Sequence, residues 1–192
     1  MRNPESASVK SEADGLLSGF APVSQVDANI LILGSMPGKK SLELQQYYGH
    51  ARNLFWPIIA EIFEFDKHLD YVSRCQKLIE HQLAVWDVLK HCERPGSLDS
   101  AIKKDSMIIN DFERFFQDHP KVQKVLFNGK TAEKLFLRFV QPGLKHLKLI
   151  YQGLPSTSPA NASMPREVKQ KLWKKAFMQT SAVHRYSYDF QT

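Results

Sequence analysis

Cysteine is scarce in this chain, which has two in 192 residues, Cys75 and Cys92. Two cysteines are too few for a disulfide framework and for a four-cysteine zinc or iron–sulfur site. No segment approaches the roughly 20 consecutive apolar residues of a membrane span. The first fifteen residues are polar and charged and lack the apolar stretch of a secretory signal. We therefore expect a cytoplasmic protein in a reducing, intracellular setting, with no membrane association.

Several catalytic signatures are also missing. The segment GSMPGKKS, from Gly34 to Ser41, is similar to a P-loop, but three residues separate its glycines and Lys39 is followed by Lys40. The sequence contains no G-x-S-x-G elbow and no H-E-x-x-H motif, and its histidines show no metal-ligand spacing. These absences argue against an NTPase, a serine hydrolase and a metalloenzyme.

Positive charge is concentrated in one part of the chain. The formal net charge is +6. Residues 121–175 contain twelve Lys/Arg and two Asp/Glu. The rest of the chain contains fourteen Lys/Arg and eighteen Asp/Glu. Such a segment is consistent with a surface that faces a polyanion, or with an ordinary solvated lysine-rich face.

Hydrophobic patterning predicts alternating strands and helices. Apolar runs predict strands over 28–34, 83–89, 122–127 and 146–151, and helical spacing predicts helices over 53–64, 130–140 and 166–180. This alternation is typical of an α/β protein with a parallel sheet covered on both sides. We expect one domain over 19–180, a flexible leader over 1–18 and a tail over 181–192.

Ligands of open α/β sheets bind beyond the carboxyl ends of the strands. Two small-residue loops are expected there, over 34–38 and over 154–159. Between them in sequence lies an aromatic segment, over 45–56, in which Phe55 and Trp56 are expected to be core. Tyr47 and Tyr48, beside a glycine, offer a flat face on which a nucleobase can stack.

Taken together, these segments resemble a known family. In order, GSMPG with QQYYGHARNLFW, AVWDVLKHCERPGSLDSAI, VLFNGKTAEKLF and LPSTSPANA are similar to the motifs of the uracil-DNA glycosylase superfamily, most of all its family 6, the hypoxanthine (deoxyinosine)-DNA glycosylases. The resemblance implies a three-layer α/β/α sandwich with a central, mostly parallel four-stranded sheet. It implies hydrolysis of the N-glycosidic bond of a deaminated base, hypoxanthine or uracil, flipped out of DNA. It further implies no metal or cofactor, and we expect a monomer.

The resemblance also assigns site residues. Base binding is expected from Ser35, Met36, Pro37, Gly38, Tyr48 and Asp87. DNA binding is expected from Lys39, Lys40, Ser41, Ser156, Thr157, Ser158, Pro159 and Asn161. Turn chemistry accounts for Asn128, which is therefore not assigned to the base.

Two positions depart from the better-known branches of the superfamily. Met36 stands where an Asp or Asn handles the attacking water, and Leu154 stands where a histidine stabilises the leaving base. We therefore assign catalysis to Asn53, whose amide can orient water, with helix capping as the alternative role. Asp87 has a similar alternative as a surface or capping aspartate.

Two other functions stay open at this point. A catalytically weakened DNA- or nucleotide-binding protein would account for Met36 and Leu154. A small-molecule enzyme, such as a nucleoside hydrolase or a phosphotransferase, would act on free nucleosides or nucleotides and show little dependence on salt.

Overall fold

A computed structural model describes residues 15–178 and contains one central sheet of four strands. The strand order is β3-β2-β6-β7, and every neighbouring pair is parallel. The strands are Leu83–Asp87 (β3), Ile30–Gly34 (β2), Lys124–Asn128 (β6) and Ile150–Leu154 (β7). The expected parallel α/β sheet is therefore confirmed.

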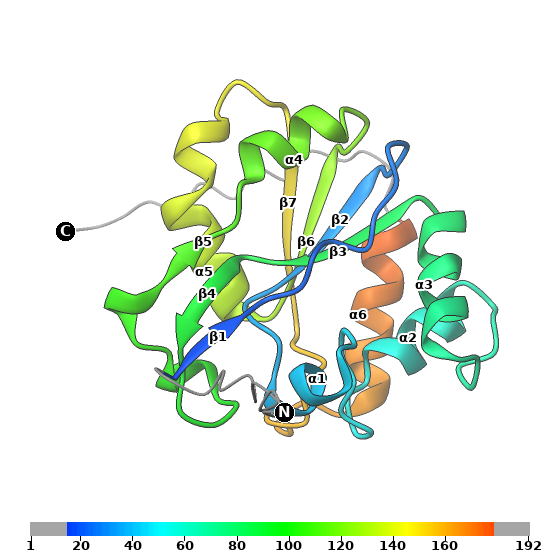
Figure 1. Cartoon of the computed structure of the whole chain (residues 1–192). Coiled ribbons are helices and arrows are strands. Elements are labelled where there is room, and N and C mark those ends of the chain that lie inside the picture. The colour runs from blue at the N-terminus through cyan, green and yellow to red at the C-terminus, as the bar shows by residue number, and fades with distance from the viewer. Residues whose placement is uncertain (1–14, 179–192) are drawn as a thin grey trace, which may run out of the picture.

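Helices cover both faces of the sheet (Figure 1). On one side lie α2 (Phe55–Ile62), α3 (Tyr71–Glu80) and α6 (Arg166–Met178). On the other lie α4 (Phe112–Asp118) and α5 (Lys130–Phe139). A short helix, α1 (Lys39–Leu44), follows β2 at its carboxyl end. The three-layer α/β/α arrangement expected from the sequence is present.

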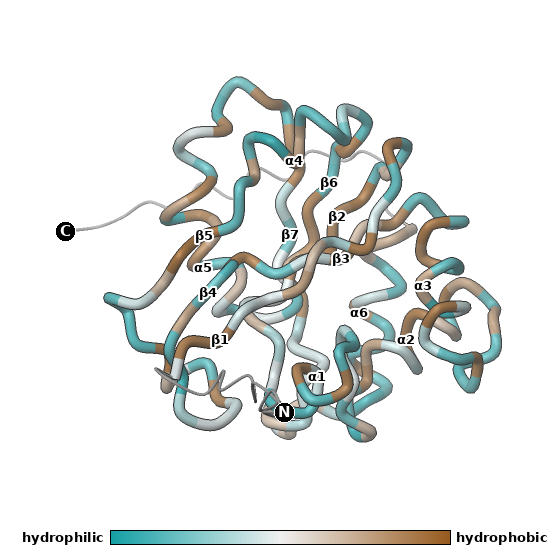
Figure 2. Tube along the Cα trace, viewed as in Figure 1, coloured by the Kyte–Doolittle hydropathy of each residue, from teal (hydrophilic) through white to brown (hydrophobic). Residues whose placement is uncertain are grey.

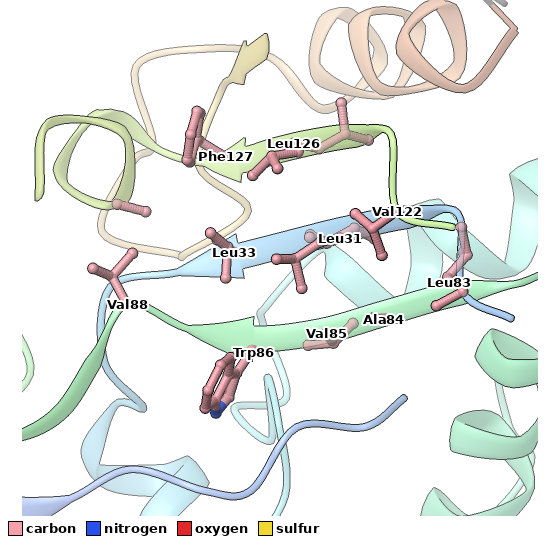
Figure 3. Close-up of a cluster of buried hydrophobic side chains, with 14 of the residues drawn as sticks. Leu31, Leu33, Leu83, Ala84, Val85, Trp86, Val88, Val122, Leu126 and Phe127 are labelled. Carbon is pink, nitrogen blue, oxygen red and sulfur yellow. The ribbon is translucent and has the colours of Figure 1, made fainter. Parts of the chain in front are cut away.

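The core lies between these layers. Central strand β2 is apolar along its length, as the hydropathy colouring shows (Figure 2). Leu31, Leu33, Val85 and Leu126 from three adjacent strands are fully buried and lie close together (Figure 3). Burying apolar surface on both faces stabilises a parallel sheet, and it explains why these strands are continuous hydrophobic runs.

A second, antiparallel sheet was not expected from the sequence. It has the order β1-β4-β5, formed by Leu16–Ser18, Leu89–Glu93 and Ile108–Ile109. β4 follows β3 after one residue, and its charged and polar residues lack the hydrophobic pattern by which a strand is predicted. The expected leader over 1–18 is thus wrong at its end, because residues 16–18 are β1; residues 1–14 and the tail over 181–192 lie outside the described residues.

The sequence also placed one strand too early. We expected it over 146–151, whereas β7 is Ile150–Leu154 and includes Gly153. Within residues 15–178, no helix is long and apolar enough to cross a membrane.

Candidate functional site

A cavity of about 330 Å³ opens beyond the carboxyl ends of the central strands. The sheet register pairs Gly34 with Asp87 and Asn128 with Leu154, so the last residues of all four strands lie in one row. The expected loops 34–38 and 154–159 both reach this row. Both loops therefore line one cavity.

Most of the residues assigned from the sequence line this cavity. They are Ser35, Met36, Pro37, Gly38, Lys39, Lys40, Ser41, Tyr48, Asn53, Asp87, Thr157, Ser158, Pro159 and Asn161. Ser156 is not among its lining residues. The lining residues that were not assigned from the sequence include His50, Ser97, Leu98 and Asp99. The last three come from the loop after β4, whose place depends on the unexpected small sheet.

Arg94 fixes the first loop from inside the protein. Its side chain is fully buried, and its guanidinium donates to the carbonyl oxygens of Met36 (3.4 Å) and Pro37 (2.5 Å). Asp99 lies 3.8 Å from this guanidinium and accepts a hydrogen bond of 2.8 Å from the Ser35 hydroxyl. The network holds loop 34–38 against the loop after β4, and neither charged residue was found from the sequence.

The Met36 side chain is part of a second hydrophobic cluster and not a polar site. It packs with Leu89 and Cys92 of β4 and is 6% exposed. Any contact from Met36 to a bound base is therefore expected from its main chain. Leu154, the other departure, belongs to the main core.

Asn53 lies at the cavity, and its side chain also bonds to the main chain at the start of α2, one residue before the N-cap Leu54. Its Oδ1 accepts a hydrogen bond of 2.9 Å from the main-chain N–H of Phe55, at the start of α2. The next residue, Leu54, donates its N–H to the Thr157 carbonyl at 3.0 Å. Asn53 is thereby tied to the second loop, and both roles weighed for it are compatible with its position.

Tyr47 and Tyr48 both offered a stacking face in the sequence, and Tyr48 alone was assigned to the base; the structure gives them different surroundings. The Tyr47 side chain is buried, and its hydroxyl donates to main-chain carbonyls of the segment before β2, 3.1 Å away at Ala21. The Tyr48 ring stacks on Phe55 with centroids 3.9 Å apart. Burial, reinforced by nearby Asp87, raises the pKa of Tyr48 far above its usual range, so its hydroxyl stays protonated.

Asp87 stands at the inner end of the cavity and not at the surface, contrary to its alternative role. It is 4% exposed, and its Oδ2 atom has no hydrogen-bond partner in the described structure. Burial and the nearby Asp99 raise the pKa of Asp87 to about 7, although Arg94 opposes the shift. A buried carboxyl poised near neutrality is typical of a functional site.

The second loop is held from below by side chains of β6 and α6. The Asn128 amide nitrogen donates to the Thr157 hydroxyl, and the Asn128 amide oxygen accepts from the Thr157 main-chain N–H, each at 2.8 Å. The Trp173 indole donates to the Pro155 carbonyl at 3.0 Å, and the Lys169 ammonium donates to the Asn161 carbonyl at 2.5 Å. The loop therefore has a defined shape before any ligand binds.

Two residues assigned to DNA from the sequence have their polar groups bonded within the protein. Thr157 is fully buried, and its N–H, carbonyl and hydroxyl are already bonded within the protein, so it shapes the loop. Ser41 is 6% exposed, and its hydroxyl oxygen accepts the Gly49 N–H at 3.0 Å. The Ser156 and Ser158 hydroxyls each accept the main-chain N–H two residues ahead, so they also stabilise the turn of the loop.

The basic segment over 121–175 is only partly a surface feature. Lys124 and Lys169 are buried, and each donates to a main-chain carbonyl. The cations that line the cavity are Lys39 and Lys40, from outside that segment. Leu98, on the same rim, is 57% exposed and has a large apolar side chain.

Comparison with known proteins agrees with this fold and site. The family model of the Uracil DNA glycosylase superfamily matches residues 21–180. The chain therefore belongs to the uracil DNA glycosylase superfamily, as the sequence motifs implied.

Individual relatives cover nearly the same span. Proteins named hypoxanthine DNA glycosylase from Methanosarcina barkeri and Methanosarcina acetivorans are 35% and 33% identical over 160 residues, which is 83% of this chain and 96% of each relative. The solution NMR structure of a Methanosarcina acetivorans protein, provisionally described as a uracil DNA glycosylase, is 31% identical and superposes with a TM-score of 0.72. It covers 84% of this chain and 96% of its own.

Proposed function

We propose that this protein is a monofunctional DNA glycosylase that hydrolyses the N-glycosidic bond of a deaminated base and leaves an abasic site. The single observation that carries the proposal is one cavity lined by Tyr48, Asn53 and Asp87. A stacking ring, an amide and a carboxyl are the groups needed to hold a flipped base and a water molecule. The names of the relatives favour hypoxanthine as the base.

The chemistry we propose is dissociative. The bond between the sugar C1′ and the base nitrogen breaks, the electron pair leaves with the base, and an oxocarbenium-like sugar forms. Water held by Asn53 then adds its oxygen to C1′ and loses a proton, while the departing base gains one. Within residues 15–178, the main-chain N–H groups of Met36 and Gly38 donate to no protein acceptor, so they can stabilise the negative charge on the leaving base.

DNA is the proposed partner. Lys39 and Lys40 line the cavity and can neutralise phosphates on either side of the flipped nucleotide. Exposed Leu98 can fill the space that the base vacates, as apolar side chains do in other DNA-bending proteins. Pro159 and Asn161 lie on the opposite loop and approach the minor groove. We propose that one monomer acts on one base and that the protein is cytoplasmic.

A second candidate is a binding protein of the same fold with weakened catalysis. It is favoured by Met36 and Leu154, whose side chains are packed in the hydrophobic clusters and cannot handle water or a leaving base. The two candidates agree on DNA binding and disagree only on bond cleavage.

The deciding experiment uses duplexes that each carry one hypoxanthine, uracil or xanthine, with an undamaged duplex as the control. We expect alkali-labile abasic sites at hypoxanthine and a loss of roughly 10²-fold in single-turnover release for Asn53→Ala. Tight binding to every damaged duplex without any abasic site would favour the binding protein. Turnover of free deoxyinosine at a salt-independent rate would favour a small-molecule enzyme.

A further inference from the structure

The loop that follows β4, residues 94–99, brings an exposed leucine to the cavity. Of the described residues that line the cavity, Leu98 alone is a large hydrophobic residue that is exposed. The second loop contributes Pro159 and Ala160, which are smaller. A side chain that fills a gap in a base stack acts best when its position is set before binding, because ordering a mobile loop costs free energy. The contacts that hold Leu98 therefore bear on how it acts.

Both neighbours of Leu98 are bonded to the first loop and to the helix after it. The Ser97 hydroxyl oxygen accepts the main-chain N–H of Lys39 at 3.1 Å. The Asp99 carboxylate accepts a hydrogen bond of 2.8 Å from the Ser35 hydroxyl. These partners lie 58 and 64 residues away along the chain, so the two bonds join separate loops. Leu98 is thereby held from both sides.

The Ser97 contact also supplies a helix cap that the local sequence lacks. Helix α1 begins at Lys39, and Gly38 at its N-cap has no side chain with which to accept an N–H. A serine oxygen is one of the preferred acceptors at such a helix end. The Ser97 hydroxyl fills this role from a distant part of the chain. The start of α1 and the place of Ser97 therefore depend on each other.

Arg94 ties the base of the same loop to the same partner. Its buried guanidinium donates to the carbonyl oxygens of Met36 and Pro37, and its Nε atom donates to the Gly96 carbonyl at 3.3 Å. Gly96 has a φ of +76°, which a glycine adopts readily, and the chain turns there just before Ser97. Residues 34–39 and 94–99 are thus joined at three places into one unit.

We propose that Ser97 and Asp99 are positioning residues that hold Leu98 ready to enter the base stack of double-stranded DNA. The proposal rests on the glycosylase function and deepens the part that Leu98 has in it. Lys39 belongs to the same unit through its main chain, and its side chain lies beside that of Lys40 at the cavity. A phosphate bound by these lysines therefore sets where along the strand Leu98 enters. Single-stranded DNA has no paired stack to fill, so release from it does not need this arrangement.

The test measures single-turnover release of hypoxanthine from a duplex and from the same strand alone, and compares the ratio of the two rates. Ser97→Ala removes the acceptor of the Lys39 N–H, and the ratio should fall about fivefold. Ser97→Thr keeps a hydroxyl and should restore the ratio. Ser100→Ala is the matched control, because Ser100 is an exposed serine of the next turn whose hydroxyl has no partner within residues 15–178. It should leave the ratio unchanged.

A second set of variants asks whether Ser97 acts through Leu98. In the Leu98→Ala protein there is no large side chain left to position, so adding Ser97→Ala should change the duplex rate less than twofold. Asp99→Ala tests the other anchor and should lower the ratio about tenfold, since a bond to a carboxylate is stronger than a neutral one. It should likewise lose its effect in the Leu98→Ala protein. If single strands release no base, the duplex rates in the two backgrounds make the same comparison.

The outcomes separate this inference from the proposed function. Release of hypoxanthine from the duplex at an undiminished rate in Ser97→Ala and Asp99→Ala would overturn the positioning role and leave the glycosylase intact. Equal effects of these substitutions with and without the leucine would show that Ser97 and Asp99 act independently of Leu98, and would overturn it as well. No release of any deaminated base by the unmodified protein would overturn the glycosylase, and the inference with it.

Discussion

The main-chain N–H of Phe55 donates a 2.9 Å hydrogen bond to the side-chain oxygen of Asn53, at the wall of the cavity. The bond orients the amide and connects it to the first turn of α2. It means that loss of Asn53 changes the helix start as well as the site. A variant that separates capping from catalysis is therefore required.

Asn53→Ser should separate them. Serine keeps a side-chain oxygen for the Phe55 N–H, so its free energy of unfolding should stay within about 1 kcal/mol of the unmodified protein. Without the amide, single-turnover release of hypoxanthine should fall roughly 10²-fold. Asn53→Ala should show the same kinetic loss and lower stability. Full activity in the serine variant would reduce Asn53 to a cap.

Asp87 should make stability depend on pH. The folded protein keeps the Asp87 proton up to about pH 7, owing to burial and Asp99 and against the effect of Arg94. The unfolded chain releases it near pH 4. Stability is therefore lost as pH rises between these values. Relative to Asp87→Asn, the unmodified protein should lose on the order of 2 kcal/mol from pH 5 to pH 8, measured by urea unfolding.

The same carboxyl should shape the pH profile of base release. A carboxylate that accepts from the base N–H must be ionised, so hypoxanthine release should rise with pH through about 7. Asp87→Asn should lack this rise. If release instead falls as pH rises through this range, the carboxyl acts as an acid toward the leaving base and not as an acceptor.

Arg94 should be needed for the shape of the first loop. Arg94→Met removes a buried guanidinium that serves two carbonyls of the loop and faces Asp99. The loop carbonyls left unpaired, together with the partly exposed Asp99 carboxylate that loses its cation, should lower the free energy of unfolding by about 3 kcal/mol. Arg94→Lys should recover only part of it, because lysine lacks the fork of donors. Chemical denaturation of the three proteins measures this, and equal stability would contradict it.

DNA affinity should depend steeply on salt through the lysines at the rim. Lys39→Ala and Lys40→Ala should each reduce the slope of log K against log salt by about 1 and weaken all duplexes alike. Lys121→Ala, at an exposed position remote in sequence from both loops, provides a comparison. A slope unchanged in both rim variants would remove these lysines from the phosphate contacts.

We expect Leu98 to assist base release from double-stranded DNA and not from single-stranded DNA. Leu98→Ala shortens the exposed side chain at the rim, so nothing large fills the gap left by the flipped base. We expect a fall of about tenfold in release from a duplex and little change for single-stranded DNA, where no stack is disrupted. Equal losses on both substrates would contradict the wedge role.

The sequence by itself determined the central layers and most of the cavity. The apolar runs of β2, β3 and β6 predicted a buried parallel sheet, because only strands covered on both faces are so continuously hydrophobic. Since the carboxyl ends of such strands meet at one edge, the motif around Gly34 and the loop around Ser158 were expected near each other, and they line one cavity.

Only the tertiary structure showed which residues far apart in the sequence meet at the site. The polar sequence of β4 gave no strand signal, and its pairing with β1 and β5 places Arg94, Leu98 and Asp99 at the site. Thr157 and Lys169 are buried, although the sequence placed them at the surface. The Tyr48 hydroxyl and the Asp87 Oδ2 atom are also buried, and neither has a hydrogen-bond partner in the described structure. The local sequence pattern shows which residues are apolar. Which polar side chains are buried, and which groups they bond to, depends on residues far away in the chain. Burial and bonding partners in turn set the chemistry of the site.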